Sequence, residues 1–205
     1  MQFGCRINSG AGMALLSERA LRARASGFTK IAEGNLKKSL RDHAASGAEF
    51  DVFLSHSALD QDVVRGLWRS LEEDFGFAVY VDWIVDPDLD RTKVNATTAE
   101  RLRARLLQSK ALLYASSVNS TESKWMPWEL GFFDGLRSRA AVLPVSKTPQ
   151  PDSAHKGIEY LGLYPYVSEE RIKGSDNTTL WVNANKTTYT TLRQWVAGQD
   201  PIPVE

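Results

Sequence analysis

A short apolar run opens the central part of the chain, Phe50-Asp51-Val52-Phe53-Leu54-Ser55-His56. Ser57-Ala58-Leu59-Asp60 follows it as a helix start signal, and apolar residues then recur at helical spacing as far as Phe75. Gly76 ends that helix, and Phe77-Ala78-Val79-Tyr80-Val81-Asp82-Trp83 is a second run rich in strand-forming residues. This order predicts a parallel β-α-β unit.

The alternation of helix and strand continues downstream. Thr97 starts a helical pattern, residues 111–114 form a third apolar run, residues 125–137 a further helix and residues 140–145 a fourth strand. We therefore predict an α/β fold, a flavodoxin-like open parallel sheet with helices on both faces. Past Val145 the pattern is weaker. It predicts short strands at 164–167 and, at an edge, 180–182, and a closing helix over 188–197.

Residues 13–45 are rich in alanine, leucine and arginine, with apolar residues at near-helical spacing. They predict one or two amphipathic helices ahead of the sheet. The expected organisation is an N-terminal helical arm (1–49), a core (50–145) and a C-terminal part of the same domain (146–205).

Composition narrows the classes of partner. Lysine plus arginine and aspartate plus glutamate both number 25 among the 205 residues, so no overall basic field favours nucleic acid. The single cysteine, Cys5, excludes an internal disulfide and a cysteine-based zinc site. No apolar run approaches the roughly 20 residues that cross a bilayer. We expect a cytoplasmic protein with neither a nucleic-acid nor a membrane partner.

Polar and aromatic side chains follow the strands where each is expected to end. Ligands of open parallel sheets bind beyond those carboxyl ends. The residues expected at this rim are Ser55, His56, Ser57, Asp82, Trp83, Ser116, Ser117, Trp125, Trp128 and Glu129. The loop over 84–96 is also a functional candidate, because connections in such units usually have about 2–6 residues.

Glu129 is the unusual member of this set. Trp125, Trp128, Phe132 and Leu136 recur at spacings of three and four, and Glu129 falls at the margin of the apolar stripe that they predict. A carboxylate there is partly desolvated and is a candidate for chemistry. The pattern also fits a first-turn glutamate that the helix dipole favours and that keeps its head in water, and taken alone it favours this second interpretation slightly.

Other motifs predict no cofactor and no metal. No glycine-rich phosphate loop is present, and His43, His56 and His155 lack metal-ligand spacing. The acidic residues Asp86, Asp88 and Asp90 alternate as in a calcium loop, but the glycine and glutamate that such a loop needs are missing. We expect a solvated loop there.

Three segments resemble the Toll/interleukin-1 receptor (TIR) family, in particular its stand-alone bacterial members: Asp51 to Ser57, Gly76 to Asp82, and Ser123 to Gly131. In enzymatic members a glutamate on the late helix cleaves the nicotinamide–ribose bond of NAD, and Glu129 matches it by position. The resemblance also implies that Phe53, Ser55 and the 84–96 loop bind NAD or gate its site, and that Trp83 and Trp125 stack on it. Pro127 and Trp128 make this helix start bulkier than in many relatives.

The resemblance implies an NAD-consuming enzyme of bacterial defence, of the Thoeris type, with NAD as substrate rather than cofactor. Its ADP-ribose-type product would act on a separate effector protein, and TIR surfaces would mediate self-assembly. The expected catalytic residue is Glu129. The expected substrate-binding residues are Phe53, Ser55, His56, Asp82, Trp83, Ser116, Trp125 and Trp128. The alternatives are a non-catalytic TIR–TIR adaptor and a factor that interferes with host signalling.

Overall fold

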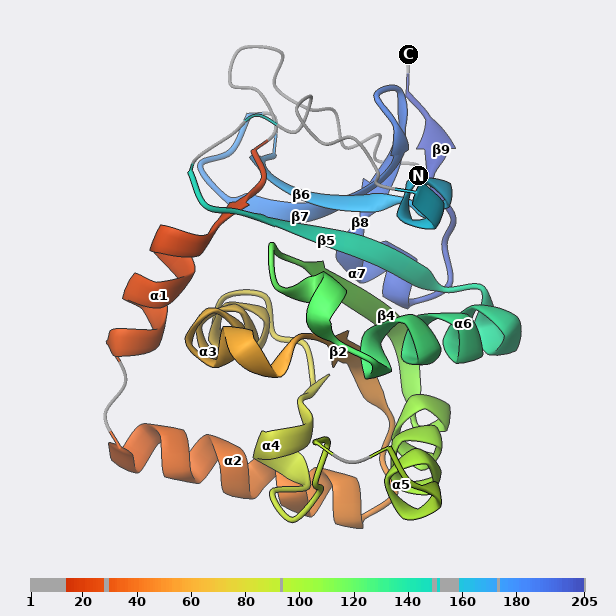
Figure 1. The fold of residues 1–205 in the computed structure, drawn as a ribbon. Coiled ribbons are helices and arrows are strands. Elements are labelled where there is room, and N and C mark those ends of the chain that lie inside the picture. The colour runs from red at the N-terminus through yellow and green to blue at the C-terminus, as the bar shows by residue number, and fades with distance from the viewer. Residues whose placement is uncertain are drawn as a thin grey trace. The chain divides into compact units, whose positions relative to one another are not determined.

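The computed structural model describes residues 14–27, 30–92, 94–148, 151, 159–172 and 174–204. Cys5, His155 and the start of the expected N-terminal arm lie outside these ranges. The chain divides into two compact units, one of Ala20–Ala140 and the other of Met1–Arg19 with Ala141–Glu205. Figure 1 colours the chain by residue number. The expected division at residues 49 and 145 stays a prediction.

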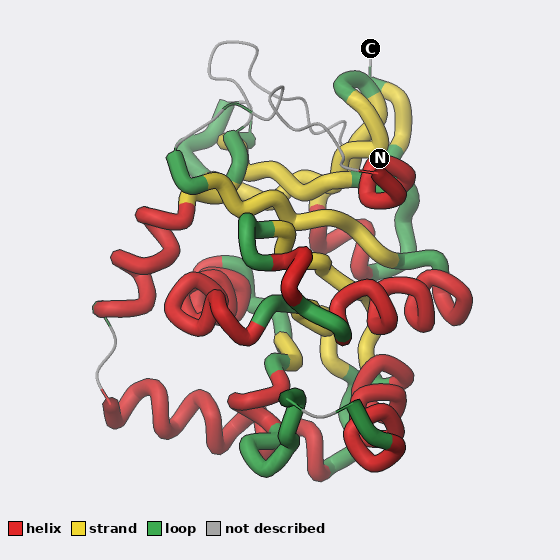
Figure 2. The backbone as a smooth tube through the Cα atoms, viewed as in Figure 1, coloured by secondary structure: helices red, strands yellow, loops and turns green. Residues whose placement is uncertain are grey.

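The unit of residues 20–140 is built on three parallel strands. The central strand β2 (Phe50–Ser55) pairs with β3 (Val79–Tyr80) on one side and with β4 (Ser109–Ser116) on the other. The chain passes from strand to strand through the helices α3 (Gln61–Arg69) and α5 (Ala96–Leu107), and α6 (Trp125–Arg137) follows β4. Figure 2 shows this alternation of strand and helix. The α/β prediction is confirmed.

Short helical turns complete these connections. The 3-10 turns η1 (Ala58–Asp60) and η3 (Ser120–Glu122) follow β2 and β4, and the π-helical turn η2 (Ser70–Asp74) extends α3. Gly76, at φ 66°, ends that extended helix as predicted.

The connection after β3 differs from the prediction. The expected strand over 77–83 is wrong in its second half, because a short helix, α4 (Asp82–Val85), begins there. The Asp82 carboxylate accepts a hydrogen bond from the backbone N–H of Trp83 at 2.6 Å, and an acidic residue is favourable in a first helical turn. The next helix also begins earlier than expected, because the Asn95 side chain, not Thr97, caps it by accepting from Thr98 N.

Two helices precede the first strand of this unit, as predicted. α1 (Glu18–Ser26) approaches α3 closely, since a Cβ added at Gly66 would lie 1.9 Å from the carbonyl oxygen of Leu21. α2 (Lys30–Ala45) contacts α4, and Arg41 Nε donates to the Ile84 carbonyl oxygen at 3.0 Å. Figure 1 shows α2 running beside α4.

The second unit combines parallel and antiparallel pairing. β5 (Ala140–Ser146) pairs in parallel with β1 (Leu16–Ser17) and with β6 (Tyr166–Arg171), and the 3-10 turn η5 (Glu159–Leu163) precedes β6. Antiparallel pairing continues from β6 through β7 (Thr178–Asn185) and β8 (Thr188–Thr191) to β9 (Ile202–Pro203).

Two expectations for this second unit are corrected. The run over 180–182 is not at an edge, because β7 pairs on both sides. The expected helix over 188–197 begins as strand β8, and a capping box between Thr191 and Gln194 delays α7 (Leu192–Val196).

Candidate active site

Glu129 lies on the buried face of α6 and has no exposed surface. The buried residues of this helix are Trp125, Met126, Glu129, Leu130 and Phe133. The expected stripe through Trp128, Phe132 and Leu136 is therefore wrong, since Trp128 and Phe132 are half-buried and Leu136 is 42% exposed. The carboxylate sits within the packed face rather than at its margin.

Both oxygens of the Glu129 carboxylate accept short hydrogen bonds. Ser55 Oγ, at the carboxyl end of β2, donates to Oε2 at 2.6 Å. Arg91 Nη2, from the loop after α4, donates to Oε1 at 2.6 Å. A buried carboxylate needs such partners, because desolvating an unpaired charge is costly.

The Arg91 guanidinium joins Glu129 to a second carboxylate. Its Nη1 lies 2.5 Å from Asp82 Oδ2, and the other oxygen of Asp82 lies 3.4 Å from His56 Nε2. The other ring nitrogen of His56 lies 2.8 Å from the Leu54 carbonyl oxygen. We call Ser55, His56, Asp82, Arg91 and Glu129 the ion cluster.

The two carboxylates of the ion cluster have pKa values that are shifted in opposite directions. Burial raises the pKa of Glu129, the nearby charge of Asp82 raises it further, and Arg91 and Ser55 only partly oppose this. Burial also disfavours the charged form of Asp82, but His56 and Arg91 outweigh it and lower the pKa of that carboxyl. Asp82 is thus the firmly ionised member, and Glu129 depends on a nearby cation for its charge.

The structure gathers four of the expected substrate-binding residues around Glu129. Ser55, His56 and Asp82 belong to the ion cluster, and the Trp125 indole N–H donates to the Arg91 carbonyl oxygen at 2.9 Å. Trp125 is buried and meets Trp128 edge-on, with 5.5 Å between ring centroids.

The other four expected residues lie differently. Phe53 is buried and stacks on Tyr80, the Trp83 ring lies beneath both Lys37 and Arg65, and Trp128 stacks on Phe132. Ser116 ends β4 and is half-buried. Within the described ranges, no hydrogen bond or ion pair joins the side chains of Phe53, Trp83, Ser116 or Trp128 to the ion cluster.

Arg91 is the member of the ion cluster that sequence reasoning missed. The unusual length of its loop was the only signal, and a charged loop has no periodicity that marks one buried residue. The expectation that Asp86 is solvated is also wrong, because it is 4% exposed and accepts from Tyr80 OH at 3.0 Å. No group of three or more His, Cys, Asp or Glu side chains in the described part of the chain is placed to hold a metal ion.

This geometry, an α/β unit with one buried glutamate at the carboxyl end of its strands, agrees with the comparison with known families. A family model for the TIR domain matches residues 52–174, and the chain therefore belongs to the TIR-domain family. No helix in the described ranges has the length and hydropathy that a membrane span needs.

Two curated relatives are similar to this chain. The "Probable 3' cyclic ADP-D-ribose synthase ThsB'" of Bacillus cereus (strain MSX-D12) is 47% identical over 147 residues, which are 72% of this chain and 75% of that protein. The "Putative cyclic ADP-D-ribose synthase TIR2" of Cytobacillus dafuensis is 32% identical over 98 residues, which are 47% of this chain and 26% of that protein.

Proposed function

We propose that the protein cleaves the nicotinamide–ribose bond of NAD and converts the remainder to a cyclic ADP-ribose that serves as a signal in bacterial defence. The names of both relatives, a probable and a putative cyclic ADP-D-ribose synthase, support this activity. The observation that carries it is the fully buried Glu129 carboxylate at the carboxyl end of β2.

Glu129 is the proposed catalytic residue. When the bond breaks, its electron pair goes to the pyridinium nitrogen, nicotinamide leaves as a neutral molecule, and positive charge develops on the ribose carbon. A carboxylate in a site that excludes water stabilises that charge strongly. One carboxylate suffices because the leaving group needs no proton, whereas most glycosidases use a pair of carboxylates.

Cyclisation then needs a nucleophile from the same molecule. A nucleophilic atom of the bound ADP-ribose attacks the anomeric carbon, forms the new bond and loses its proton to solvent. Water in its place gives linear ADP-ribose, so the exclusion of water from a buried site favours the cyclic product.

Incubation with NAD followed by mass identification of the products tests this function. We expect the native protein to release nicotinamide and a product lighter than ADP-ribose by one water. Glu129→Gln should form neither product, and its thermal stability should equal that of the native protein. Intact NAD after incubation with the native protein, or equal turnover by the variant, would contradict the proposal. The first result would favour a TIR–TIR adaptor, in which Glu129 and Arg91 form a structural ion pair.

A further inference from the structure

Asp60 occupies the N-cap position of α3 but does not cap that helix. An aspartate at this position ordinarily accepts a hydrogen bond from a backbone N–H in the first turn of its helix. Within the described ranges the Asp60 side chain makes no such bond, and the residue is only 5% exposed. A buried carboxylate needs hydrogen-bond partners, so those of Asp60 must come from another part of the fold.

The partners of Asp60 belong to the connection that follows β4. Ser117 Oγ donates to Oδ2 of the carboxylate at 2.5 Å, and Asn119 Nδ2 donates to Oδ1 at 2.6 Å. We call Asp60, Ser117 and Asn119 the clasp. Neutral donors, a hydroxyl and an amide, thus satisfy both oxygens of this buried carboxylate.

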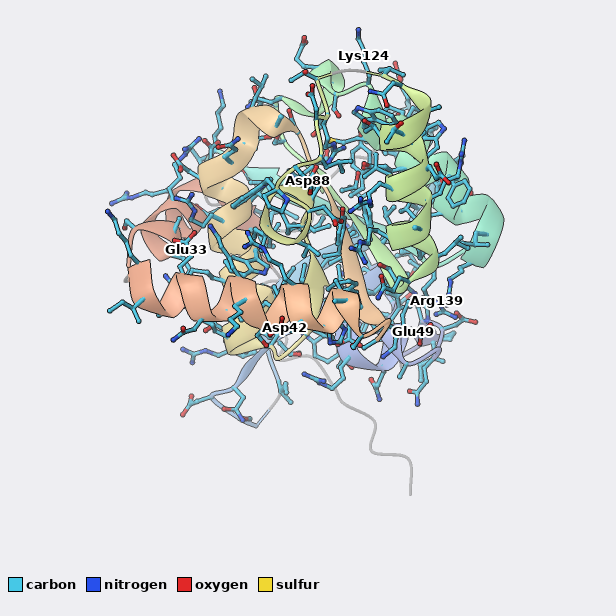
Figure 3. The ribbon with its side chains drawn as sticks, turned by 90° about the horizontal axis from the view of Figure 1, so that it is seen from below. Glu33, Asp42, Glu49, Asp88, Lys124 and Arg139 are labelled. Atoms are coloured by element: carbon cyan, nitrogen blue, oxygen red, sulfur yellow. The ribbon has the colours of Figure 1, made fainter. Side chains whose placement is uncertain are left out.

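The clasped connection leads directly into α6, the helix that carries the proposed catalytic residue. Ser120 is buried, and its hydroxyl accepts from Ser117 N at 2.7 Å. Further along, Ser123 Oγ accepts from Met126 N at 3.3 Å, in the first turn of α6. Lys124, labelled in Figure 3, is the last residue before that helix. The connection therefore fixes where α6 begins.

The other side of the clasp follows directly on Ser55. The strand β2 ends at Ser55, and Asp60 N donates to the Ser57 carbonyl oxygen at 3.0 Å in the turn that comes next. Ser55 Oγ in turn donates to Glu129 at 2.6 Å. The clasp thus joins the segment after β2 to the segment before α6, and the relative placement of these two segments sets the Ser55–Glu129 hydrogen bond.

A carboxylate that must face a reacting carbon tolerates little displacement. A misplacement of about 1 Å can slow a reaction by about a hundredfold. The bond from Ser55 also favours the ionised form of Glu129, so a longer bond would leave more of that carboxyl protonated. A shift of α6 would therefore weaken Glu129 through both its position and its charge.

We propose that Asp60 is a positioning residue for nicotinamide–ribose cleavage, because the clasp holds α6 in the place that aligns Glu129 with Ser55. This inference rests on the proposed function and adds a residue on which that site depends. Among the residues that the structure describes, no hydrogen bond or ion pair joins the Asp60 side chain to the ion cluster, so its effect passes through α6.

Steady-state kinetics of nicotinamide release by Asp60→Ala test the proposal. We expect kcat to fall about tenfold or more while KM stays within about twofold, because alignment at the reacting carbon is lost and the contacts that bind NAD remain. The acidic limb of a plot of kcat against pH should also move to higher pH, because Ser55 supports the Glu129 carboxylate less well.

Asp62→Ala is the matched control for Asp60→Ala. Asp62 lies in the first turn of the same helix, but its side chain is 65% exposed and pairs with Arg22 at 3.5 Å on the surface. Its kcat and its pH profile should equal those of the native chain.

Asp60→Asn separates hydrogen bonding from charge. An asparagine can accept from Asn119 and donate to Ser117 Oγ, so this variant should regain most of the kcat that Asp60→Ala loses. A loss as large as that of Asp60→Ala would mean that the charge of Asp60 matters rather than the clasp, and it would overturn the proposal.

Asn119→Ala covers the case in which Asp60→Ala does not fold. Asn119 is half-buried, and its loss leaves the bond from Ser117 in place, so a smaller fall in kcat with a shift of the acidic limb in the same direction is expected. Native kcat and an unshifted acidic limb in a folded Asp60→Ala, or in Asn119→Ala if Asp60→Ala does not fold, would overturn the proposal.

An NMR titration of the Glu129 side-chain carboxyl separates failure of this proposal from failure of the proposed function. If the native chain releases no nicotinamide, the proposed function fails, and the titration then decides whether the clasp positions Glu129. A higher pKa of Glu129 in Asp60→Ala than in the native chain and in Asp62→Ala supports the clasp. An unchanged pKa of Glu129 overturns it.

Discussion

At the scale of single residues, the charge of Glu129 is set by its neighbours rather than by water. Arg91 from the loop after α4, Asp82 from α4, His56 after β2 and Ser55 on β2 face it, and only Arg91 is a permanent cation. The sequence predicted a partly desolvated carboxylate at this position but not the arginine that favours its ionised form. The burial and pairing of Glu129 depend on which residue of the loop after α4 contacts α6. The local sequence pattern does not encode this long-range contact.

The pH dependence of turnover follows from this environment. Burial raises the pKa of Glu129 above its ordinary 4.5, and catalysis needs the ionised form, so turnover should fall on acidification at a higher pH than for an exposed glutamate. Arg91→Ala should move the acidic inflection higher still, because a charge that favours the carboxylate is lost. A plot of log turnover against pH checks both. A native profile that stays flat down to pH 4.5 would argue against Glu129 as the ionised catalyst.

At the scale of elements, the main strands and helices of residues 50–146 follow from their apolar periodicity, and β2, α3, β4, α6 and β5 lie close to the predicted ranges. The second strand was predicted too long, because Val81 and Trp83 have the β propensity of a strand while Asp82 favours a helix start. Of the antiparallel strands, β6 and β7 were predicted as shorter runs at 164–167 and 180–182, and β8 was predicted as part of a helix, because these sequences carry little alternation of apolar and polar residues.

Glu72, in the π-helical turn η2, should make stability depend on pH. Burial raises its pKa to about 7, while it accepts a hydrogen bond from Val79 N at 2.6 Å. The folded state then binds a proton that the unfolded state releases, so this group's contribution to stability falls as pH rises from 4.5 to about 7. Glu72→Gln should therefore be more stable than the native chain above pH 7, by about 2 kcal/mol. Urea unfolding at pH 5 and pH 8 measures this.

The contrast between the two pH values is diagnostic for Glu72. Near pH 5 the native glutamate is largely protonated in the fold, and the advantage of Glu72→Gln should be small. An equal gain or loss at both pH values would mean that packing, rather than ionisation, governs this position.

Gly66, on α3, lies where α1 approaches α3 closely. A side chain there collides with the backbone of Leu21, so Gly66→Ala should destabilise the unit by about 1–3 kcal/mol and loosen α1. Gly34→Ala is the matched control, because nothing lies within 4 Å of the added Cβ and alanine favours the helix by about 0.5–1 kcal/mol. Thermal unfolding compares the stability of the two variants, and limited proteolysis near α1 compares how firmly each holds that helix. Equal stability of the two variants would mean that α1 does not depend on this contact.

At the scale of the whole molecule, the sequence alone predicted the α/β class and the TIR family. The prediction rested on three short segments, two of them strands and the third an aromatic-rich helix start. It placed Glu129, Ser55, His56, Asp82 and Trp125 in one region, since parallel strands carry their ends to one rim. It also placed Trp83 there. The structure instead stacks that ring with Lys37 of α2 and Arg65 of α3, an arrangement that depends on how the N-terminal helices dock.

The most direct test of the central claim is the rate of nicotinamide release from NAD by the native chain and by Glu129→Gln at matched concentration. Glutamine keeps the size of the side chain and its capacity to accept from Ser55, but it cannot carry the negative charge that opposes the developing cation. We expect release by the variant to be at least about a hundredfold slower, with the folded fraction unchanged. A rate within twofold of the native rate would contradict the assignment of Glu129 as the catalytic carboxylate.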